Sequence, residues 1–432
     1  MKVCVCGLWH LGTVTAACLA SAGHDVAGLD RDAGVVDRLS QGTPPLFEPG
    51  LEDLVKSGLA AGRLRFTGEV ATAVSDADVV WITVDTPVDD EDRADVESVV
   101  RGAAALFPHL RDGALVLVSS QLPVGTTGRL EAMFAETASG RRVGFAYSPE
   151  NLRLGKAIEV FMQPDRVVAG VRSDADRARI AELLRPFTDR IEWMSVESAE
   201  MTKHALNAFL ATSVTFINEI AALCEQVGAD ASEVARGLKS EARIGPRAYL
   251  SPGGAFAGGT LARDVMFLSD LGRETNVATH LLSSVKTSND AHRQWAQRRL
   301  AQVLGGVEGR TVAVWGLTYK PGTDTLRRSS AIELCTWLGA RGARVRAHDP
   351  AVRQLPPEVS ATIQLASDPL AAADQAAALV VATPWPEYRS VDARALADRM
   401  QGNVVLDANG FLAATVGREP GLSYLTVGKA TA

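Results

Sequence analysis

Several features that mark special classes of protein are scarce or missing in this sequence. The five cysteines form neither a disulfide framework nor a metal-ligand pattern, because they are scattered: Cys4, Cys6, Cys18, Cys224 and Cys335. No uninterrupted apolar run approaches the roughly 18 residues of a membrane span, and the N-terminal MKVCVCGLWHLG lacks the layout of a signal peptide. The net charge of −7 argues against nucleic acid or an anionic membrane surface as the main partner. We therefore expect a reduced, cytoplasmic protein without a metal site and without a nucleic-acid or membrane partner.

Short apolar runs alternate with helical patterns in the first part of the chain. KVCVCG (2–7) is followed by a helix that ends near Ser21, with Gly23 as its stop signal, and then by DVAGLD (25–30). Similar apolar runs follow at 78–84, 114–120 and 143–147. Continuous apolar strands separated by helices predict a parallel sheet that is covered on both faces.

The pattern changes near Val196 and returns after residue 305. Residues 198–229 carry apolar side chains at three- and four-residue spacing, which predicts one long helix, and further helices follow to about Val303. VAVWGLTYKP (312–321) then echoes VCVCGLWHLG, ARVRAHDP (343–350) echoes HDVAGLD, and LVVATPWP (379–386) echoes WITVDTPV. We predict an α/β fold in which two Rossmann-like, doubly wound parallel-sheet domains, 1–195 and 305–432, are joined by a central helical segment, 196–304. The long apolar helix face predicts a homodimer, because a single subunit rarely buries so much of one helix.

The stretch GLWHLG (7–12) has the context of a dinucleotide-binding turn. It follows a predicted strand and opens a predicted helix, and Asp30 ends the next strand 23 residues after Gly7. Gly7 allows the tight turn and Gly12 allows the helix to pack closely on the strand, while the helix N-terminus attracts a pyrophosphate. Asp30 would accept hydrogen bonds from ribose hydroxyls and repel a 2′-phosphate, which favours NAD over NADP. The second glycine of the fingerprint is Trp9, so the indole must either pack on the dinucleotide or obstruct it.

Longer stretches resemble the UDP-glucose/GDP-mannose dehydrogenase family over nearly the whole chain, and their order and spacing match as well. The RIGP-type loop is similar to the UDP-glucose branch of the family. The stretches that carry the resemblance are LFEPGLEDL (46–54), VDTP (84–87), YSPENLRLG (147–155), PDRVVAG (164–170), AEMTKHALNAFLATSVTFINE (199–219), RIGPRAYLSPGGAFAGG (243–259) and GLTYKPGTDTLRRS (316–329).

The resemblance implies two Rossmann-like domains linked by a helical dimer core, and a double oxidation of a sugar C6 alcohol to an acid with two NAD. In this family a cysteine captures the intermediate aldehyde as a thiohemiacetal. A second hydride transfer gives a thioester, which water then cleaves.

The resemblance also implies roles for single residues. Lys203 and Asn207, four residues apart on one helix face, would hold the sugar C6 oxygen and its water, and a cation and an amide can stabilise a developing alkoxide. Asp264 would work with the lysine, and Glu150 would handle water or a proton. The cofactor residues implied are Gly7, Trp9, His10, Leu11, Gly12, Asp30, Thr86, Gln121 and Arg327. The substrate residues implied are Glu150, Asn151, Leu152, Lys203, Asn207, Arg243 (towards a neighbouring subunit), Tyr249, Gly253, Gly258 and Lys320.

Four functional positions depart from the family pattern. Thr260 occupies the position of the nucleophilic cysteine, Gln121 replaces a water-holding threonine, and Leu154 replaces a glutamate; Trp9 is the fourth. A threonine hydroxyl is much harder to ionise than a thiol and is a poor nucleophile without an activating base. We therefore count Thr260 among the candidate catalytic residues, because the group at this position decides whether a thioester forms and hence which product is made.

Three functions remain open from the sequence. The first is a nucleotide-sugar oxidoreductase that takes a UDP-hexose only to the C6 aldehyde, or uses the aldehyde transiently in a redox-neutral epimerisation. The second is a full UDP-glucose 6-dehydrogenase that forms the uronic acid. The third is a non-catalytic sugar-nucleotide binder or partner subunit, which the indole of Trp9 motivates.

Overall fold

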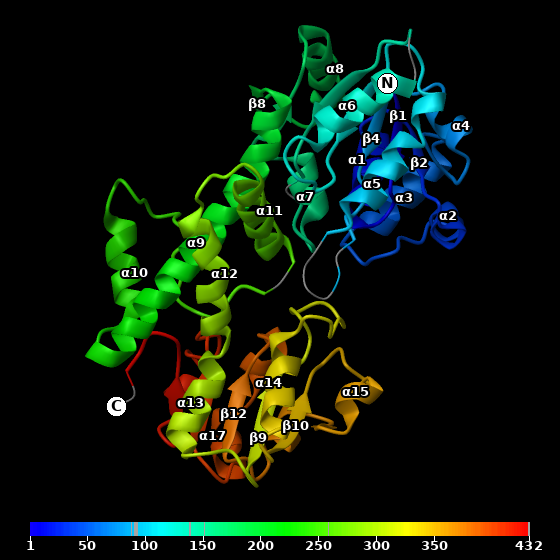
Figure 1. Cartoon of the computed structure of the whole chain (residues 1–432). Helices are drawn as coiled ribbons and strands as arrows, with labels where there is room; N and C mark the ends of the chain where they lie inside the picture. The colour runs from blue at the N-terminus through cyan, green and yellow to red at the C-terminus, as the bar shows by residue number, and fades with distance from the viewer. Residues whose placement is uncertain (88, 90–93, 138–139, 151, 258, 431–432) are drawn as a thin grey trace. The chain divides into compact units, whose positions relative to one another are not determined.

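The computed structural model describes residues 1–87, 89, 94–137, 140–150, 152–257 and 259–430 (Figure 1). The chain forms two compact units, Met1–Leu206 and Asn207–Ala432, and each is described by itself.

Unit 1 is built on an eight-stranded sheet with the order β3-β2-β1-β4-β5-β6-β7-β8. Neighbouring strands are parallel except for β6 and β7. The strand order reverses between β1 and β4, and open α/β sheets bind ligands at such a point, outside the carboxyl ends of the strands. The strands are β1 (Lys2–Cys6), β2 (Asp25–Leu29), β3 (Leu64–Thr67), β4 (Val79–Ile82), β5 (Leu115–Val118), β6 (Gly144–Tyr147), β7 (Val167–Gly170) and β8 (Ile191–Met194).

Helices cover both faces of this sheet, as the apolar strands predict. Val3 and Val5 belong to one buried cluster together with α1 and α3, whereas Cys4 belongs to the opposite cluster together with α5 and α6. The doubly wound architecture is therefore confirmed. The helices are α1 (His10–Ser21), α2 (Ala33–Ser40), α3 (Leu51–Ala60), α4 (Val70–Val74), α5 (Val96–Ala104), α6 (Thr126–Thr137), α7 (Ala157–Met162) and α8 (Asp174–Leu184).

The long helix predicted from the sequence is α9 (Val196–Val227), 32 residues in one piece. Its first residues, through Leu206, belong to unit 1, and the rest belongs to unit 2. Charged and polar residues interrupt the apolar side chains of α9. An 18-residue window of this helix nevertheless has a mean hydropathy of 1.4 and is 39% buried. By length and composition alone, α9 could therefore span a membrane. A single helix of this kind is weak support for a span, and α9 carries several buried polar side chains that bind loops of unit 1.

Unit 2 combines helices with a six-stranded parallel sheet of order β11-β10-β9-β12-β13-β14. The helices that precede the sheet are α10 (Ala231–Ser240), α11 (Thr260–Glu274), α12 (His280–Arg293) and α13 (Trp295–Leu304). The strands are β9 (Thr311–Trp315), β10 (Arg344–His348), β11 (Ile363–Leu365), β12 (Ala378–Val381), β13 (Val404–Asp407) and β14 (Ser423–Leu425). The helices of the sheet domain are α14 (Ser330–Gly339), α15 (Pro357–Ser360), α16 (Pro369–Ala373) and α17 (Ala393–Arg399).

The internal echo in the sequence corresponds to two sheets of the same local design. In unit 1 the Leu8 amide donates to Asp30 Oδ2 at 2.7 Å, and in unit 2 the Leu317 amide donates to Asp349 Oδ2, also at 2.7 Å. The second carboxylate is used internally, because the Trp385 indole also donates to Asp349 Oδ2, at 3.0 Å. The carboxylate that follows β2, that of Asp30, is therefore partly exposed. The carboxylate that follows β10, that of Asp349, is buried.

The cysteines are free thiols, and all but Cys6 are fully buried, as expected for packing residues. Burial raises the pKa of the Cys335 thiol to about 12. Cys335 and Cys224 pack in the apolar core of unit 2, so neither is a ready nucleophile.

Candidate functional site

The turn at residues 7–12 requires both of its glycines. Gly7 has a φ of +94°, and a Cβ placed there would lie 2.7 Å from the Cα of Val84. A Cβ on Gly12 would lie 1.7 Å from the carbonyl oxygen of Gly7, which no side chain can tolerate. The tight turn and the close approach of α1 to it therefore have the geometry that the dinucleotide fingerprint predicts.

Asp30 lines a pocket at the carboxyl ends of β1 and β2. Its carboxylate accepts from the Leu8 amide and, at 3.0 Å, from the Asp32 amide, which leaves acceptor capacity for a ribose diol. The residues that line the pocket are Cys6, Gly7, Leu29, Asp30, Arg31, Val70, Val84, Ser98, Val99, Gly102 and Leu106. A mostly apolar lining with the single carboxylate of Asp30 and the neighbouring Arg31 fits the adenosine half of a dinucleotide.

Another pocket lies at the amino ends of β1 and β2, on the side of the sheet away from the strand carboxyl ends. Its charged lining residues include two ion pairs, Lys2 with Asp76 and Arg63 with Asp25. Because these charges are already paired, this pocket offers less to a charged ligand than the Asp30 pocket.

Trp9 caps the N-terminus of α1 with an ordinary backbone conformation, φ −74°, and its side chain is 47% exposed. The backbone therefore does not require glycine at this position, and the indole is not part of the packed core. Leu11 is partly buried in the first turn of α1.

His10 has a partner that the sequence did not indicate. Its Nε2 lies 3.0 Å from Oε2 of Glu48, a buried carboxylate that also accepts from the amides of Gly155 and Ala157 at 2.8 Å each. Glu48 thus joins the start of α1 to the loop that follows Glu150. Its presence in LFEPGLEDL was the only available signal, since more than one hundred residues separate it from its amide partners.

Thr86 and Gln121 follow β4 and β5 and are both buried. The Thr86 hydroxyl donates to the Gln121 carbonyl oxygen at 2.7 Å, and the Ser120 hydroxyl donates to the Val84 carbonyl oxygen at 2.6 Å. The two loops that carry these predicted cofactor residues are therefore held together at the carboxyl edge of the sheet.

The first turns of α9 fix the loop after β5. Glu200 is 1% exposed, and its carboxylate accepts from the amides of Gly125 at 2.6 Å and Thr127 at 2.9 Å, at the start of α6. His204 donates through Nε2 to the Leu122 carbonyl oxygen at 2.8 Å. The sequence did not single out either residue.

Lys203 stands between these two positions and contacts the loop after β6. Its ammonium donates to the Glu150 carbonyl oxygen at 2.7 Å and lies 3.6 Å from the Glu150 carboxylate, which itself accepts from the Leu152 amide at 2.9 Å. Lys203 is 6% exposed, so its charge acts in a site with little solvent. The structure brings Lys203, Glu150 and Leu152 together in unit 1, while Asn151 lies outside the described residues.

Asn207 and Asp264 form a buried pair in unit 2. The Asn207 amide nitrogen donates to Oδ2 of Asp264, which is fully buried in the second turn of α11. Thr260 is the first residue of α11 and is exposed, after Gly259 at φ +101°. An exposed hydroxyl at this place is compatible with a ligand contact.

The remaining substrate positions lie in unit 2. Gly253 is buried, and a Cβ there would lie 2.6 Å from Oδ1 of Asn409. Arg243 pairs with Glu241 at 2.9 Å on an exposed loop, and Tyr249 is 57% exposed. Gly258 lies outside the described residues.

Lys320 and Arg327 lie on the segment between β9 and α14, where Lys320 is partly buried and Arg327 is exposed. Their predicted roles towards substrate and cofactor stay predictions. Among the residues that the structure describes, no group of three or more His, Cys, Asp or Glu side chains is placed to hold a metal ion.

Family models cover most of the chain. They match the NAD-binding domain of the UDP-glucose/GDP-mannose dehydrogenase family at residues 1–188, its central domain at 197–291 and its UDP-binding domain at 313–414. UDP-glucose 6-dehydrogenase of Rhizobium meliloti (strain 1021) is 36% identical over 99% of this chain and 100% of its own length. The Pseudomonas aeruginosa enzyme of the same name is 35% identical over 99% and 98%. A UDP-glucose dehydrogenase structure from Pyrobaculum islandicum superposes with a TM-score of 0.88 at 32% identity, over 99% of this chain and 98% of that one. With the glycine turn, Asp30 and the buried lysine in place, the chain belongs to the UDP-glucose/GDP-mannose dehydrogenase family of NAD-dependent nucleotide-sugar oxidoreductases.

Proposed function

We propose that this chain oxidises the C6 alcohol of a UDP-hexose to the aldehyde and does not carry the oxidation on to the acid, or returns the hydride in a redox-neutral epimerisation. The observation that carries the proposal is the residue at the start of α11. Thr260 is exposed there, whereas the cysteines of unit 2, Cys224 and Cys335, are buried in its apolar core. A covalent thioester needs a thiolate, and neither cysteine is placed to supply one.

The groups required for the first oxidation are retained. NAD accepts a hydride when it is bound. The buried Lys203 ammonium would stabilise the alkoxide that develops at C6, and the Glu150 carbonyl oxygen orients this ammonium. Asp264 would accept the proton of the alcohol, while the amide of Asn207 holds its carboxylate in place. These roles follow the family resemblance and are consistent with the hydrogen bonds of each unit.

An aldehyde at C6 makes the C5 proton acidic, which is why epimerisation belongs to the same proposal. Removal of this proton by a base on one face, followed by protonation from an acid or water on the opposite face, would invert C5. Hydride return to C6 would then leave no net oxidation. Both forms of the proposal stop short of acid formation.

The stoichiometry of NADH tests the proposal. Purified protein is incubated with UDP-glucose and NAD, and we expect at most one NADH per sugar, an aldehyde that hydrazine traps, or deuterium incorporation at C5. Two NADH per sugar together with a uronic acid would overturn it. The variant Thr260→Cys restores a thiol at the start of α11, and we expect it to form a covalent adduct with the aldehyde or to release the acid.

The full UDP-glucose 6-dehydrogenase reaction is the second candidate, and identity to enzymes of that name along the whole chain favours it. In this case an aldehyde hydrate would be the species oxidised in the second step. The NADH count distinguishes the two candidates. A non-catalytic sugar-nucleotide binder is the candidate of another class, and the absence of a calorimetric NAD signal with UDP-glucose binding intact would favour it.

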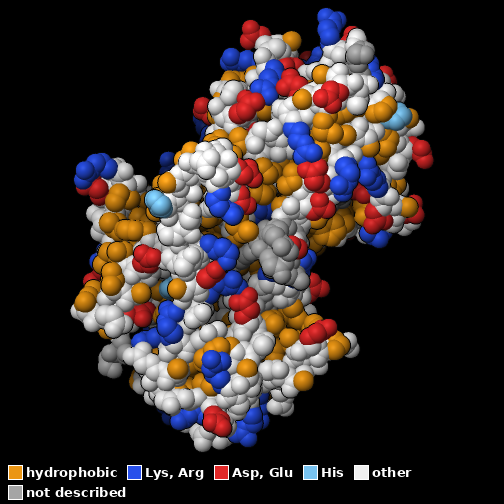
Figure 2. Space-filling model, viewed as in Figure 1, with side chains coloured by type: hydrophobic (Ala, Val, Ile, Leu, Met, Phe, Trp, Pro, Cys, Tyr) orange, Lys and Arg blue, Asp and Glu red, His pale blue; other side chains and the backbone are white. Residues whose placement is uncertain are grey.

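We also propose that two copies pair through α9, in the cytoplasm. Phe209, Phe216 and Leu223 recur every seven residues and are 70%, 46% and 63% exposed, and Val227 extends the row at 77%. Hydrophobic side chains gather on the flank of unit 2 where α9 and α10 lie (Figure 2). Exposed apolar rows of this kind mark protein interfaces. We expect light scattering of the unchanged chain to give the mass of a dimer. The Phe216→Lys variant should give the mass of a monomer. A monomer mass for the unchanged chain would contradict the proposal.

A further inference from the structure

Polar side chains hold the glycine-rich stretch 253–257, which lies in the segment between α10 and α11; Asn218, Asn289 and His292 are buried and Asn409 is exposed. The Gly253 amide donates to Oδ1 of Asn218 at 3.0 Å, and His292 Nε2 donates to the Gly253 carbonyl oxygen at 2.8 Å. The Gly254 amide donates to Oδ1 of Asn409 at 2.9 Å. These partners come from α9, α12 and the loop after β13, so three separate parts of unit 2 converge on two adjacent glycines.

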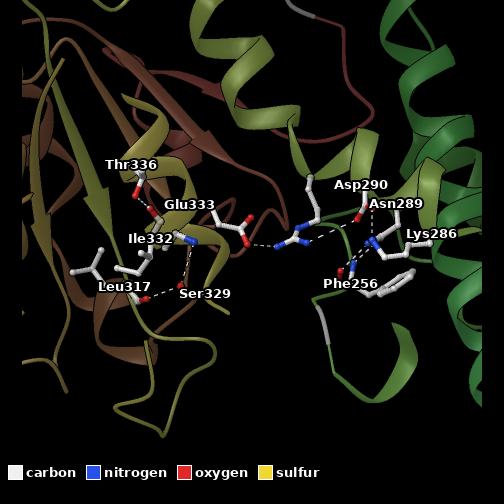
Figure 3. Close-up of polar contacts among 11 residues, drawn as sticks. Phe256, Lys286, Asn289, Asp290, Leu317, Ser329, Ile332, Glu333 and Thr336 are labelled. Atoms are coloured by element: carbon white, nitrogen blue, oxygen red, sulfur yellow. Dashed lines mark hydrogen bonds and ion pairs between the residues drawn. The ribbon is translucent and has the colours of Figure 1, made fainter. Parts of the chain in front are cut away.

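Asn289 of α12 brackets Phe256 in the way that a neighbouring strand would (Figure 3). Its Oδ1 accepts from the Phe256 amide at 3.0 Å, and its Nδ2 donates to the Phe256 carbonyl oxygen at 2.9 Å. Both bonds use the same side chain, which fixes its orientation and both backbone groups at once. Asn289 is 3% exposed, so water does not compete for these bonds.

Phe256 also packs against α11, the helix that carries Asp264. Phe256 packs against a small apolar cluster that includes Ala208 of α9, Val265 and Leu268 of α11, and Val285 of α12. Val265 follows Asp264, and Ala208 follows Asn207, so the cluster lies beside the Asn207–Asp264 pair. The backbone of 253–257 is thereby tied to the position of α11.

We propose that Asn289 and His292 are positioning residues that hold 253–257 in the conformation that receives the sugar of the nucleotide sugar. This rests on the proposed function for the identity of the ligand. A glycine-rich segment loses much conformational entropy when it becomes ordered. If the segment is already ordered before binding, this loss does not weaken the affinity for the ligand. The two side chains act through the backbone of Gly253 and Phe256.

The same helix offers a matched control. Lys286 and Asp290 form an exposed pair at 2.6 Å on α12 (Figure 3), with both side chains more than two-fifths exposed. Exposed pairs of this kind contribute little to stability. Lys286→Gln therefore changes α12 without touching the bonds to 253–257.

Calorimetric titration with UDP-glucose, UDP and NAD tests the proposal, since the ratio of the UDP-glucose and UDP affinities reports the sugar alone. We expect Asn289→Ala to lower the UDP-glucose affinity about tenfold while the affinities for UDP and NAD stay within about twofold. His292→Leu should behave in the same way, whereas His292→Gln, which keeps a donor near the Nε2 position, should retain most of the affinity. Lys286→Gln should match the unchanged chain.

Equal losses for UDP and UDP-glucose would show a purely structural role and overturn the proposal, as would unchanged UDP-glucose affinity in the folded variants. If Asn289→Ala does not fold, the comparison of His292→Leu with His292→Gln decides the same question. The titration requires no turnover, so a failed NADH count would refute the proposed reaction and leave this measurement intact. Failure of the unchanged chain to bind UDP-glucose would refute both.

Discussion

Replacing Glu200 by alanine is expected to destabilise unit 1 strongly. The carboxylate is 1% exposed and accepts from two amides, those of Gly125 and Thr127. Alanine would leave the Gly125 N–H and the buried Thr127 N–H without their acceptor at the start of α6. The loop after β5, which carries Gln121, would keep only the bond from His204 to the Leu122 carbonyl oxygen among these attachments to α9.

The magnitude follows from the two bonds. A hydrogen bond to a charged group contributes about 1.5–3 kcal/mol, so two give about 3–6 kcal/mol. Partial relaxation of the loop reduces this figure, and we expect a loss of about 3 kcal/mol in the free energy of unfolding. For a unit of this size, Met1–Leu206, such a loss lowers the melting temperature by roughly 6–12 °C.

Glu197→Gln is the matched control, since it lies one turn earlier on the same helix. Glu197 pairs with Arg172 at 2.7 Å, and its side chain is 47% exposed. The exposed pair is expected to contribute less than about 1 kcal/mol. Scanning calorimetry and urea unfolding of both variants measure the difference. A loss in Glu200→Ala no larger than that in Glu197→Gln would refute the reasoning.

Three further perturbations have defined outcomes. Gly12→Ala places a Cβ 1.7 Å from the Gly7 carbonyl oxygen and should abolish NAD binding in calorimetry, with at least about 1–3 kcal/mol of destabilisation; normal NAD affinity would contradict the predicted turn. Asp30→Ala removes the ribose acceptor and should lower NAD affinity about tenfold without a matching loss for NADP; equal losses would argue against its role. Burial lowers the pKa of His292 below 6.5, so the unfolded chain takes up a proton at a higher pH than the folded chain does. The free energy of unfolding is therefore highest above pH 6.5 and falls as the pH drops, until the pH passes the pKa of the folded state. Urea unfolding between pH 7.5 and 5 should show this fall, and His292→Gln should reduce it; an identical pH dependence in the variant would exclude His292 as a cause.

The parts of the fold that were predictable from sequence are those encoded locally. Apolar runs followed by a glycine and ended by an acid predicted β1, β2 and their counterparts in unit 2, because strand burial and tight turns depend on adjacent residues. The spacing of apolar residues likewise predicted α9 to within a few residues at either end.

The supports of the candidate site were not predictable in this way. Glu48 and Glu200 are buried carboxylates whose partners lie 107 and 75 residues away, and only the fold brings them together. The divergence between the two sheets was also hidden. Asp30 and Asp349 end equivalent strands, yet only the structure reveals that Trp385 donates to the second carboxylate.

The continuity of α9 has a consequence for the order of events during synthesis. The last strand of the first sheet ends at Met194, but Glu200 and His204, which satisfy the loop after β5, come only with the following helix. In a nascent chain that has delivered all eight strands, the Gly125 and Thr127 amides therefore still lack their acceptor, and the Leu122 carbonyl oxygen still lacks its donor. Roughly a second of further translation supplies them. Completion of the nucleotide-binding unit should thus coincide with the emergence of the helix that begins the second unit.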